Sequence, residues 1–154
     1  MKKTIFSIII AVAGLILISV SALSSTDSEI KPEQCKGTAA CFFGKVTAIT
    51  DGDTIKVDGK SIRLALTSTP ELHESGGINA REFTLEFCPP GTIAIVDEDD
   101  GQQEGSYDRM IAIVYCNDMN LNAALLDSKR AIISERFCLT SEFGEEDWAK
   151  RNGC

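Results

Sequence analysis

Two arginines and two carboxylates lie along this chain at positions where a fold could bring them to one phosphate. Phosphodiester hydrolysis needs cations near the phosphoryl oxygens, a positioned water and often a divalent metal. Arginine suits the first task, a carboxylate suits the second, and oxygen ligands suit a hard cation such as calcium. The residues that offer these groups are, in the same order, Arg63 and Arg109, then Glu71, then Asp53 with the backbone carbonyl of Thr69.

Short strands joined by tight turns must position these side chains. Apolar and polar residues alternate over 54–57 and again over 61–66, and Asp58-Gly59 between them is a hairpin signal. Further strands are expected over 41–49, 92–96 and 107–115, and helices over 80–88 (capped by Asn79), from 121 onward and in the tail after 141. This order predicts an α+β, mainly β fold: a five-stranded Greek-key barrel of the oligonucleotide/oligosaccharide-binding type (an OB-fold) with two to three packed helices.

Three motifs in order resemble the thermonuclease (staphylococcal nuclease-like) family: Asp-Gly-Asp-Thr at 51–54, Ile-Arg-Leu at 62–64 and Thr-Pro-Glu at 69–71. The resemblance covers about residues 44–126, with Arg109 and Leu121-Asn122 as later landmarks. It implies a barrel with helices packed on it and a nuclease activity. It also implies a catalytic trio of Arg63, Glu71 and Arg109, with calcium held by Asp53 and Thr69.

The chain departs from that family at two positions. Ser68 stands where the family has a second metal-binding Asp, and Asp108 stands where the family has the Gly of Tyr-Gly-Arg. A neutral hydroxyl cannot replace a carboxylate on a hard cation, so we expect a weakened calcium site. Asp108 places a negative charge beside the cation of Arg109. Both changes predict weaker or lost nuclease activity.

Each candidate residue also has a structural interpretation. Asp51-Gly52-Asp53 could be only a turn, Arg63 a salt-bridge partner, Glu71 a helix or loop cap, and Arg109 a partner of Asp108. Three functions therefore compete: a nuclease for DNA or RNA, a non-catalytic binding module on the same barrel, and a structural module held by disulfides. We favour the nuclease, because the arginine and glutamate trio has no obvious structural need to occur together.

Charge limits the kind of nucleic-acid binding that is possible. The net charge is −8, and without Lys2 and Lys3 the remaining chain has 13 basic and 23 acidic residues, a net charge of −10. Non-specific binding to nucleic acid relies on basic patches, so this balance argues against tight static binding but allows a few locally placed arginines. The run Asp97-Glu98-Asp99-Asp100 is expected to be a solvated loop. We expect a monomer.

Six cysteines indicate disulfides rather than a zinc site. None lies in a Cys-x-x-Cys pair, and the only histidine is His73. An even count in a small chain behind an apolar leader is typical of an oxidising compartment. Of fifteen possible pairings, we prefer the three that close local or fold-adjacent loops: Cys35–Cys41, Cys88–Cys116 and Cys138–Cys154.

The N-terminus has the residue pattern expected of a leader. Lys2 and Lys3 precede an uncharged run over 4–23, which at about 1.5 Å per residue would reach about 30 Å and could span a bilayer. Val20-Ser21-Ala22 offers a cleavage site, so a cleaved signal and an uncleaved anchor both remain open. Either way the domain is expected outside the cytoplasm, secreted or membrane-anchored. The expected organisation is a leader over 1–23, a tether over 24–40 and the barrel domain over 41–154.

Overall fold

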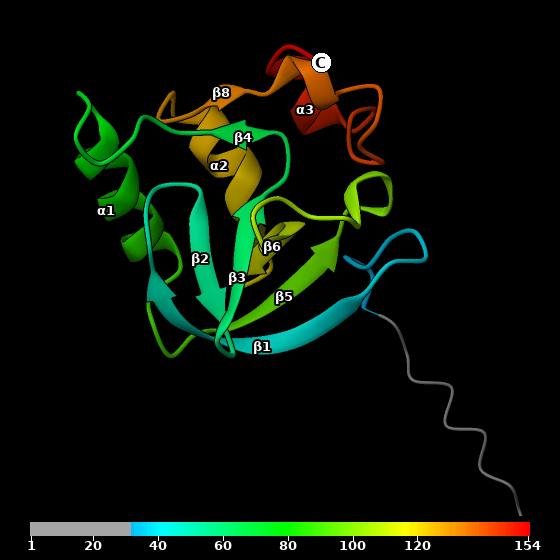
Figure 1. Ribbon diagram of the computed structural model, residues 1–154, viewed down its shortest axis with the longest axis horizontal. Coiled ribbons are helices and arrows are strands. Elements are labelled where there is room, and N and C mark those ends of the chain that lie inside the picture. The colour runs from blue at the N-terminus through cyan, green and yellow to red at the C-terminus, as the bar shows by residue number, and fades with distance from the viewer. Residues whose placement is uncertain (1–31) are drawn as a thin grey trace, which may run out of the picture. The chain divides into compact units, whose positions relative to one another are not determined.

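The computed structural model describes residues 32–154; the predicted leader and the first part of the tether lie outside the described residues. Five strands form a closed barrel: β1 (Cys41–Ile49), β2 (Thr54–Val57), β3 (Lys60–Leu64), β5 (Ile93–Glu98) and β6 (Met110–Cys116). Antiparallel pairing gives the order β3-β2-β1-β5-β6, and a parallel pairing of β3 with β6 closes the barrel (Figure 1). The prediction of a mixed α+β fold built on a five-stranded barrel is confirmed.

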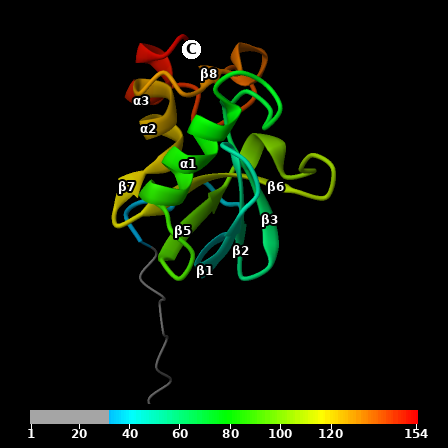
Figure 2. The same cartoon turned by 90° about the vertical axis from the view of Figure 1, so that its left-hand side faces the viewer.

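The remaining elements are short and pack around the barrel. They are β4 (Thr67–Ser68), α1 (Gly77–Phe87), η1 (Asp100–Gln102), β7 (Met119–Asn120), α2 (Leu121–Asp127), β8 (Ile132–Ile133), η2 (Glu135–Phe137) and α3 (Asp147–Arg151). The strands β4 and β8 pair with each other, and with α2 and α3 they lie beyond one end of the barrel (Figure 1). Figure 2 shows α1 beside α2 and the barrel.

The hairpin between β2 and β3 sets the position of Arg63. Asp58 and Gly59 both have positive φ angles, 47° and 80°, which is the geometry of a two-residue hairpin turn. The resulting register places Thr54 directly opposite Arg63. On the other side of β3, Arg63 is aligned with Ile111 of β6. Arg63 therefore lies beside the turn that precedes β2 and close to the start of β6.

Apolar side chains on the inner faces of the strands fill the barrel. Residues such as Ile55, Ile62 and Val114 have no exposed surface, and Leu125 of α2 joins the same cluster. The C-terminal segment contributes Phe143, which is also fully buried. The tail is thus part of the core, so the elements that it carries are held firmly against the barrel.

Several element boundaries differ from the sequence-based expectation. The first helix begins at Gly77 instead of Ala80, and Gly76, with a φ of 92°, takes the cap position expected for Asn79. A Cβ atom on Gly77 would lie 1.9 Å from the carbonyl oxygen of Glu71, so only glycine permits this close approach. Leu66, at a φ of 58°, ends the third strand early. The boundaries follow from backbone packing that residue patterns do not encode.

The sixth strand begins at Met110 instead of at Tyr107. Tyr107 and Asp108 both have positive φ angles, 52° and 58°, and Ser106 bonds with Arg109 across them. The expected start of the strand is therefore a tight turn. This turn fixes the backbone of Arg109 immediately before the barrel.

All three expected disulfides are present. Cys35–Cys41, Cys88–Cys116 and Cys138–Cys154 have Cα–Cα distances of 5.8, 5.6 and 5.4 Å. They are compatible with an extracytoplasmic location. Within residues 32–154, no helix is both long and apolar enough to cross a membrane.

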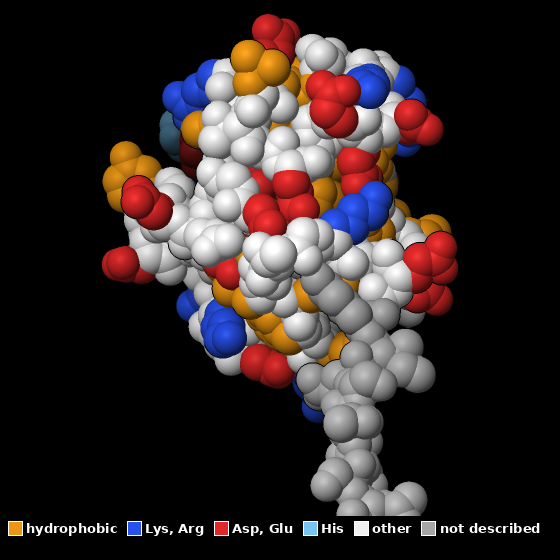
Figure 3. Space-filling model, turned by 90° about the vertical axis from the view of Figure 1, so that its right-hand side faces the viewer, with side chains coloured by type: hydrophobic (Ala, Val, Ile, Leu, Met, Phe, Trp, Pro, Cys, Tyr) orange, Lys and Arg blue, Asp and Glu red, His pale blue; other side chains and the backbone are white. Residues whose placement is uncertain are grey.

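The acidic run at 97–100 is not the solvated loop that we expected. Asp97 and Asp99 are fully buried, and the Asp97 carboxylate accepts a hydrogen bond of 2.9 Å from the backbone of Lys36. Asp100 accepts bonds from the backbone N–H groups of Thr38 and Ala39, at 2.8 and 2.6 Å. Residues 36–39 are thus attached to the barrel, so ordered structure begins before the expected start at Cys41. Acidic side chains gather near the middle of the face drawn in Figure 3.

Candidate functional site

The Asp-Gly-Asp turn is held from both sides. A Cβ atom on Gly52 would lie 2.7 Å from the side chain of Thr69, so glycine allows the two segments to approach. Thr84 of α1 donates a 2.6 Å hydrogen bond to the carbonyl of Gly52, and Asp51 accepts one of 3.1 Å from the N–H of Asp53. The turn therefore presents the Asp53 side chain in one fixed direction.

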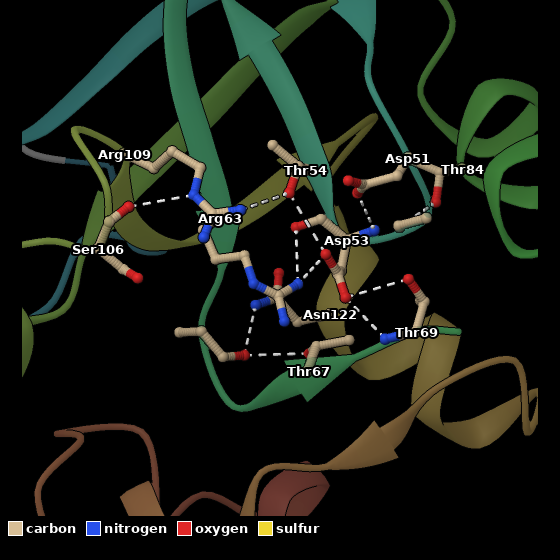
Figure 4. Close-up of polar contacts among 12 residues, drawn as sticks. Asp51, Asp53, Thr54, Arg63, Thr67, Thr69, Thr84, Ser106, Arg109 and Asn122 are labelled. Atoms are coloured by element: carbon tan, nitrogen blue, oxygen red, sulfur yellow. Dashed lines mark hydrogen bonds and ion pairs between the residues drawn. The ribbon is translucent and has the colours of Figure 1, made fainter. Parts of the chain in front are cut away.

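The Asp53 carboxylate is buried and fully bonded. One oxygen accepts from the N–H and the hydroxyl of Thr69, at 2.6 and 3.0 Å. The other accepts from the hydroxyl of Thr54 at 3.3 Å and forms an ion pair with the Arg63 guanidinium (Figure 4). Only 6% of Asp53 is exposed, so this anion depends on its protein partners rather than on water.

Arg63 is the cation at the centre of the site. Its guanidinium also donates to the backbone carbonyl of Asp53 at 3.3 Å. Burial, followed by repulsion from the charge of Arg109, lowers the pKa of Arg63 to about 10, and Arg136 acts in the same direction. The carboxylates of Asp51 and Glu71 favour the charged form. Arg63 remains a cation at neutral pH, and the charges of Arg109 and Arg136 are within electrostatic range of it.

Arg109 reaches the same region from the turn before β6. Its Nε donates to the carbonyl of Ser106 at 3.1 Å, and its Nη1 donates to the hydroxyl of Thr54 at 3.4 Å (Figure 4). In the part of the chain that the structure describes, Arg109 has no ion pair, and the proposed pairing with Asp108 is not formed. Arg109 is thus oriented by neutral acceptors, and its charge is not matched by a carboxylate.

Both arginines line a groove of about 800 Å³. Ser68 of β4 also lines it, and most of the remaining lining comes from two segments, 100–107 and 134–140. Neither Asp53 nor Glu71 belongs to the lining. The structure therefore brings Arg63, Arg109 and Ser68 together at one surface, with Asp53 behind Arg63.

Glu71 lies on an exposed loop after β4. Glu74, three residues further along, caps this loop, since its carboxylate accepts a 2.9 Å bond from the N–H of Glu71 and its own N–H donates back to the Glu71 carbonyl at 2.8 Å. The Glu71 carboxylate accepts no hydrogen bond within residues 32–154. It is therefore available to a solvent molecule, while its backbone is held in place by Glu74.

The donors around Asp53 fit a guanidinium better than a calcium ion. Both carboxylate oxygens already have two donors each, and Ser68 offers only a neutral hydroxyl where a second anion is expected. Among the described residues, one group of His, Cys, Asp or Glu lies close enough together to hold a metal ion: Cys35, Cys41 and Asp97. Its two sulfur atoms form a disulfide, so this group is not a calcium site either.

Two further residues shape the site: Asn122, which sequence reasoning named only as a landmark without a role, and Arg136, which it missed. Asn122 is fully buried, and its amide bonds to the N–H of Val114 and to the carbonyls of Ala65 and Ala112, at 3.1, 2.9 and 3.2 Å. It joins α2 to the place where β3 closes on β6, which supports the strand of Arg63. An amide among the apolar residues of 121–126 was the available signal. The second residue, Arg136, lines the groove from η2, and no local motif identifies it.

Comparison with known proteins gives relatives but no function. No family model matches the chain. An uncharacterized protein of Bacillus anthracis is 34% identical over 104 residues, which are 61% of this chain and 48% of that protein. This chain therefore spans about half the length of that relative. An uncharacterized protein of Methanocaldococcus jannaschii is 27% identical over 143 residues, 72% of this chain and 69% of that protein.

Proposed function

We propose that this chain is a phosphodiester hydrolase of the thermonuclease type, which cleaves DNA or RNA outside the cytoplasm. The observation that carries the proposal is the convergence of Arg63 and Arg109 on one groove. The negative charge of Glu71 acts on Arg63, which supports placing that carboxylate near the same phosphate. Two arginines and an available carboxylate are the groups that this reaction requires.

The strand order supports the assignment of the barrel to the Greek-key, oligonucleotide/oligosaccharide-binding type. The first three barrel strands form a meander, and the third strand closes in parallel on the last strand of the barrel, β6. The helix α1 stands between the third and fourth barrel strands. This arrangement agrees with a Greek-key barrel of the oligonucleotide/oligosaccharide-binding type, a fold that commonly binds such polymers.

In the proposed reaction, Glu71 takes a proton from a water molecule, and the oxygen of that water forms a new bond to phosphorus. The bond from phosphorus to the leaving oxygen breaks, and that oxygen takes a proton from solvent. Arg63 and Arg109 donate hydrogen bonds to the phosphoryl oxygens, where negative charge increases in the transition state.

Location and assembly belong to the same proposal. The protein would act as a monomer, either secreted or held at a membrane through residues 4–23. Its disulfides would keep the domain stable in an oxidising compartment. Calcium bound by Asp53 and Thr69 would assist the reaction only after Arg63 leaves the Asp53 carboxylate.

A binding module without catalysis is the second candidate. The ion pair between Asp53 and Arg63 favours it, because each group uses the other instead of a metal or a phosphate. The position of Glu71 outside the groove lining favours it as well. In this case the arginines would bind phosphates without cleaving them.

Digestion of plasmid DNA and of RNA by the disulfide-bonded protein, with calcium or with EDTA, tests the proposal. We expect Glu71→Gln to slow cleavage by about 10²–10⁴ and Arg109→Ala by about 10²–10³. Glu82→Gln, an exposed carboxylate on α1, is the control for Glu71. Absence of cleavage at millimolar calcium would contradict a hydrolase, and full activity in both site variants would contradict the proposed mechanism. Binding without cleavage would support the second candidate.

A further inference from the structure

Arg136 brings a third cation to the groove. It lies on the turn η2, near the C-terminal end of the chain, and lines the same groove as Arg63 and Arg109. Its guanidinium carbon lies 4.6 Å from the centre of the Phe137 ring. Within residues 32–154 it has no carboxylate partner. The ring supports one face of the guanidinium and leaves its N–H edge for a ligand.

The three arginines repel one another. The charges of Arg109 and Arg136 both act against the charged form of Arg63. Of the acidic residues in the lining, Asp100 is bonded to the backbone of residues 38 and 39, and Glu104 is exposed. Three cations with one ion pair are therefore gathered in a chain whose net charge is −8. Such a local excess of positive charge attracts a polyanion and is neutralised by it.

Arg136 approaches the groove from a different direction than the other two arginines. Arg63 and Arg109 belong to strand β3 and to the turn before β6, whereas Arg136 belongs to the C-terminal segment. The N–H of Ser134 bonds to the Leu66 carbonyl at 2.8 Å, which attaches this segment to the barrel. The Cys138–Cys154 disulfide holds its other side. The backbone of Arg136 is thus held in a fixed place beside the groove.

We propose that Arg136 forms a second phosphate subsite, so that the groove binds two successive phosphates of a nucleic-acid strand. The phosphate at Arg63 and Arg109 would be the one that is cleaved, and the neighbouring phosphate would bind Arg136. This inference rests on the proposed function for the identity of the ligand. A groove of about 800 Å³ has room for more than one phosphate group. Contacts of this kind position a strand without reading its sequence.

Calorimetry with two short ligands tests the subsite. Thymidylyl-thymidine (TpT) has a single phosphate, and its 5′-phosphorylated form (pTpT) has a second one beside it. We expect the full-length, disulfide-bonded protein to bind pTpT about tenfold more tightly than TpT, since a charged hydrogen-bonded contact is worth about 1.5 kcal/mol. In Arg136→Gln the preference for pTpT should disappear, and the affinity for TpT should fall much less than the affinity for pTpT.

Arg130→Gln is the matched control. Arg130 is also exposed and also lies 4.6 Å from a phenylalanine ring, that of Phe83, but it is not part of the groove lining. This variant should keep the preference for pTpT. With an oligothymidylate, Arg136→Gln should also reduce the slope of log K against log salt by about 0.7, the value for one lost phosphate contact on a single strand.

The outcomes separate this inference from the proposed hydrolase. Equal affinity of the wild-type protein for TpT and pTpT, or an equal loss for both ligands in Arg136→Gln, would overturn the subsite even if the protein cleaves DNA. Inorganic phosphate that binds as tightly as pTpT would overturn it too, because the groove would then be a site for a single free anion. A preference for pTpT that Arg136→Gln removes would establish the subsite even if cleavage is absent.

Discussion

Buried carboxylates occur in two regions of this molecule, and their hydrogen-bond donors differ. At the groove, Asp53 is bonded to Thr69 and forms an ion pair with Arg63. In the acidic run, Asp99 accepts from the backbone N–H groups of Gly101 and Glu142, at 3.0 and 3.1 Å, and from the Gln102 side chain at 2.7 Å. No arginine or lysine pairs with Asp99 in residues 32–154.

The difference separates a structural carboxylate from an adjustable one. Backbone N–H groups are fixed by the fold, so Asp99 holds two chain segments in a single arrangement. A guanidinium sits on a flexible side chain and can exchange one anion for another, so Arg63 can leave Asp53 for a phosphate. Four acidic residues in a row look like a candidate ion site, yet the single Asp53 is the carboxylate with an exchangeable partner. Donor type, rather than charge density, distinguishes the two regions.

The largest effect on stability is expected at Asp99. Asp99→Ala removes a buried carboxylate that accepts three hydrogen bonds, so the free energy of unfolding should fall by about 3–5 kcal/mol. Urea denaturation with the disulfides intact measures it. Glu86→Ala, an exposed carboxylate on α1, should change stability by no more than about 0.5 kcal/mol. A loss at Asp99 as small as that of the control would contradict its structural role.

Asp53→Asn should have the opposite balance, with a smaller cost in stability and a larger effect on binding. Asparagine keeps an acceptor for Thr69, so we expect a loss of about 1–2 kcal/mol in the free energy of unfolding. Arg63 loses its anion, and the affinity for TpT should therefore rise by about tenfold. Thr69→Val, which keeps the ion pair, is the control for calorimetry. A fall in affinity would mean that Asp53 assists binding instead of competing for Arg63.

Ser68→Asp tests whether the groove can hold calcium. A second carboxylate beside Asp53 would restore the anionic pair that the thermonuclease resemblance implies. It should tighten calcium binding by about tenfold, since one more anion near the ion is worth on the order of 1–2 kcal/mol at a partly solvated site. Ser68→Asn, which has the same shape without the charge, is the control. Identical calcium titrations of the wild-type protein and Ser68→Asp would place any bound calcium elsewhere.

Local patterns predicted the strands and turns of the barrel, because these depend on neighbouring residues, whereas the closed topology was expected mainly from the thermonuclease resemblance. The alternation of apolar and polar residues over 54–57 and the Asp58-Gly59 turn determine a hairpin. Its register places Arg63 opposite Thr54. The cysteine pairs were also accessible, since each preferred pair closes a short loop or joins neighbouring elements. Whether a helix begins at Gly77 or at Ala80 was not accessible, because a backbone contact with Glu71 decides it.

The parts that could not be predicted depend on contacts between distant segments. Asp97 and Asp99 form an acidic run that looks solvated, and their burial follows from residues 36 and 142. Arg136 lies 73 positions after Arg63, and only the folding of the C-terminal segment against the barrel brings both to one groove. Local residue patterns carry no signal for either arrangement.

The smallest expected effect is on the pH dependence of stability. Two residues of the same acidic cluster, Glu142 and Asp100, contribute to it in opposite directions. Burial raises the pKa of Glu142 above its ordinary value of 4.5, and the negative charges of Asp97, Asp99 and Asp100 raise it as well. The charge of Lys36 is also within electrostatic range of Glu142. The N–H groups of Ala39 and Thr38 lower the pKa of Asp100 below 3.8. A raised pKa means that the contribution of Glu142 to stability is complete below 4.5 and is lost as pH rises through the folded-state value.

Asp100 behaves in the opposite way. Its contribution is present above 3.8 and is lost as pH falls through its lower folded-state value. Between pH 7 and about pH 3, the urea midpoint of the wild-type protein should therefore rise on mild acidification and then fall. Glu142→Gln keeps an acceptor for the N–H of Asp100 but cannot titrate, so it should lose the rise and keep the fall. An unchanged rise of the urea midpoint in Glu142→Gln would assign that rise to another titrating group.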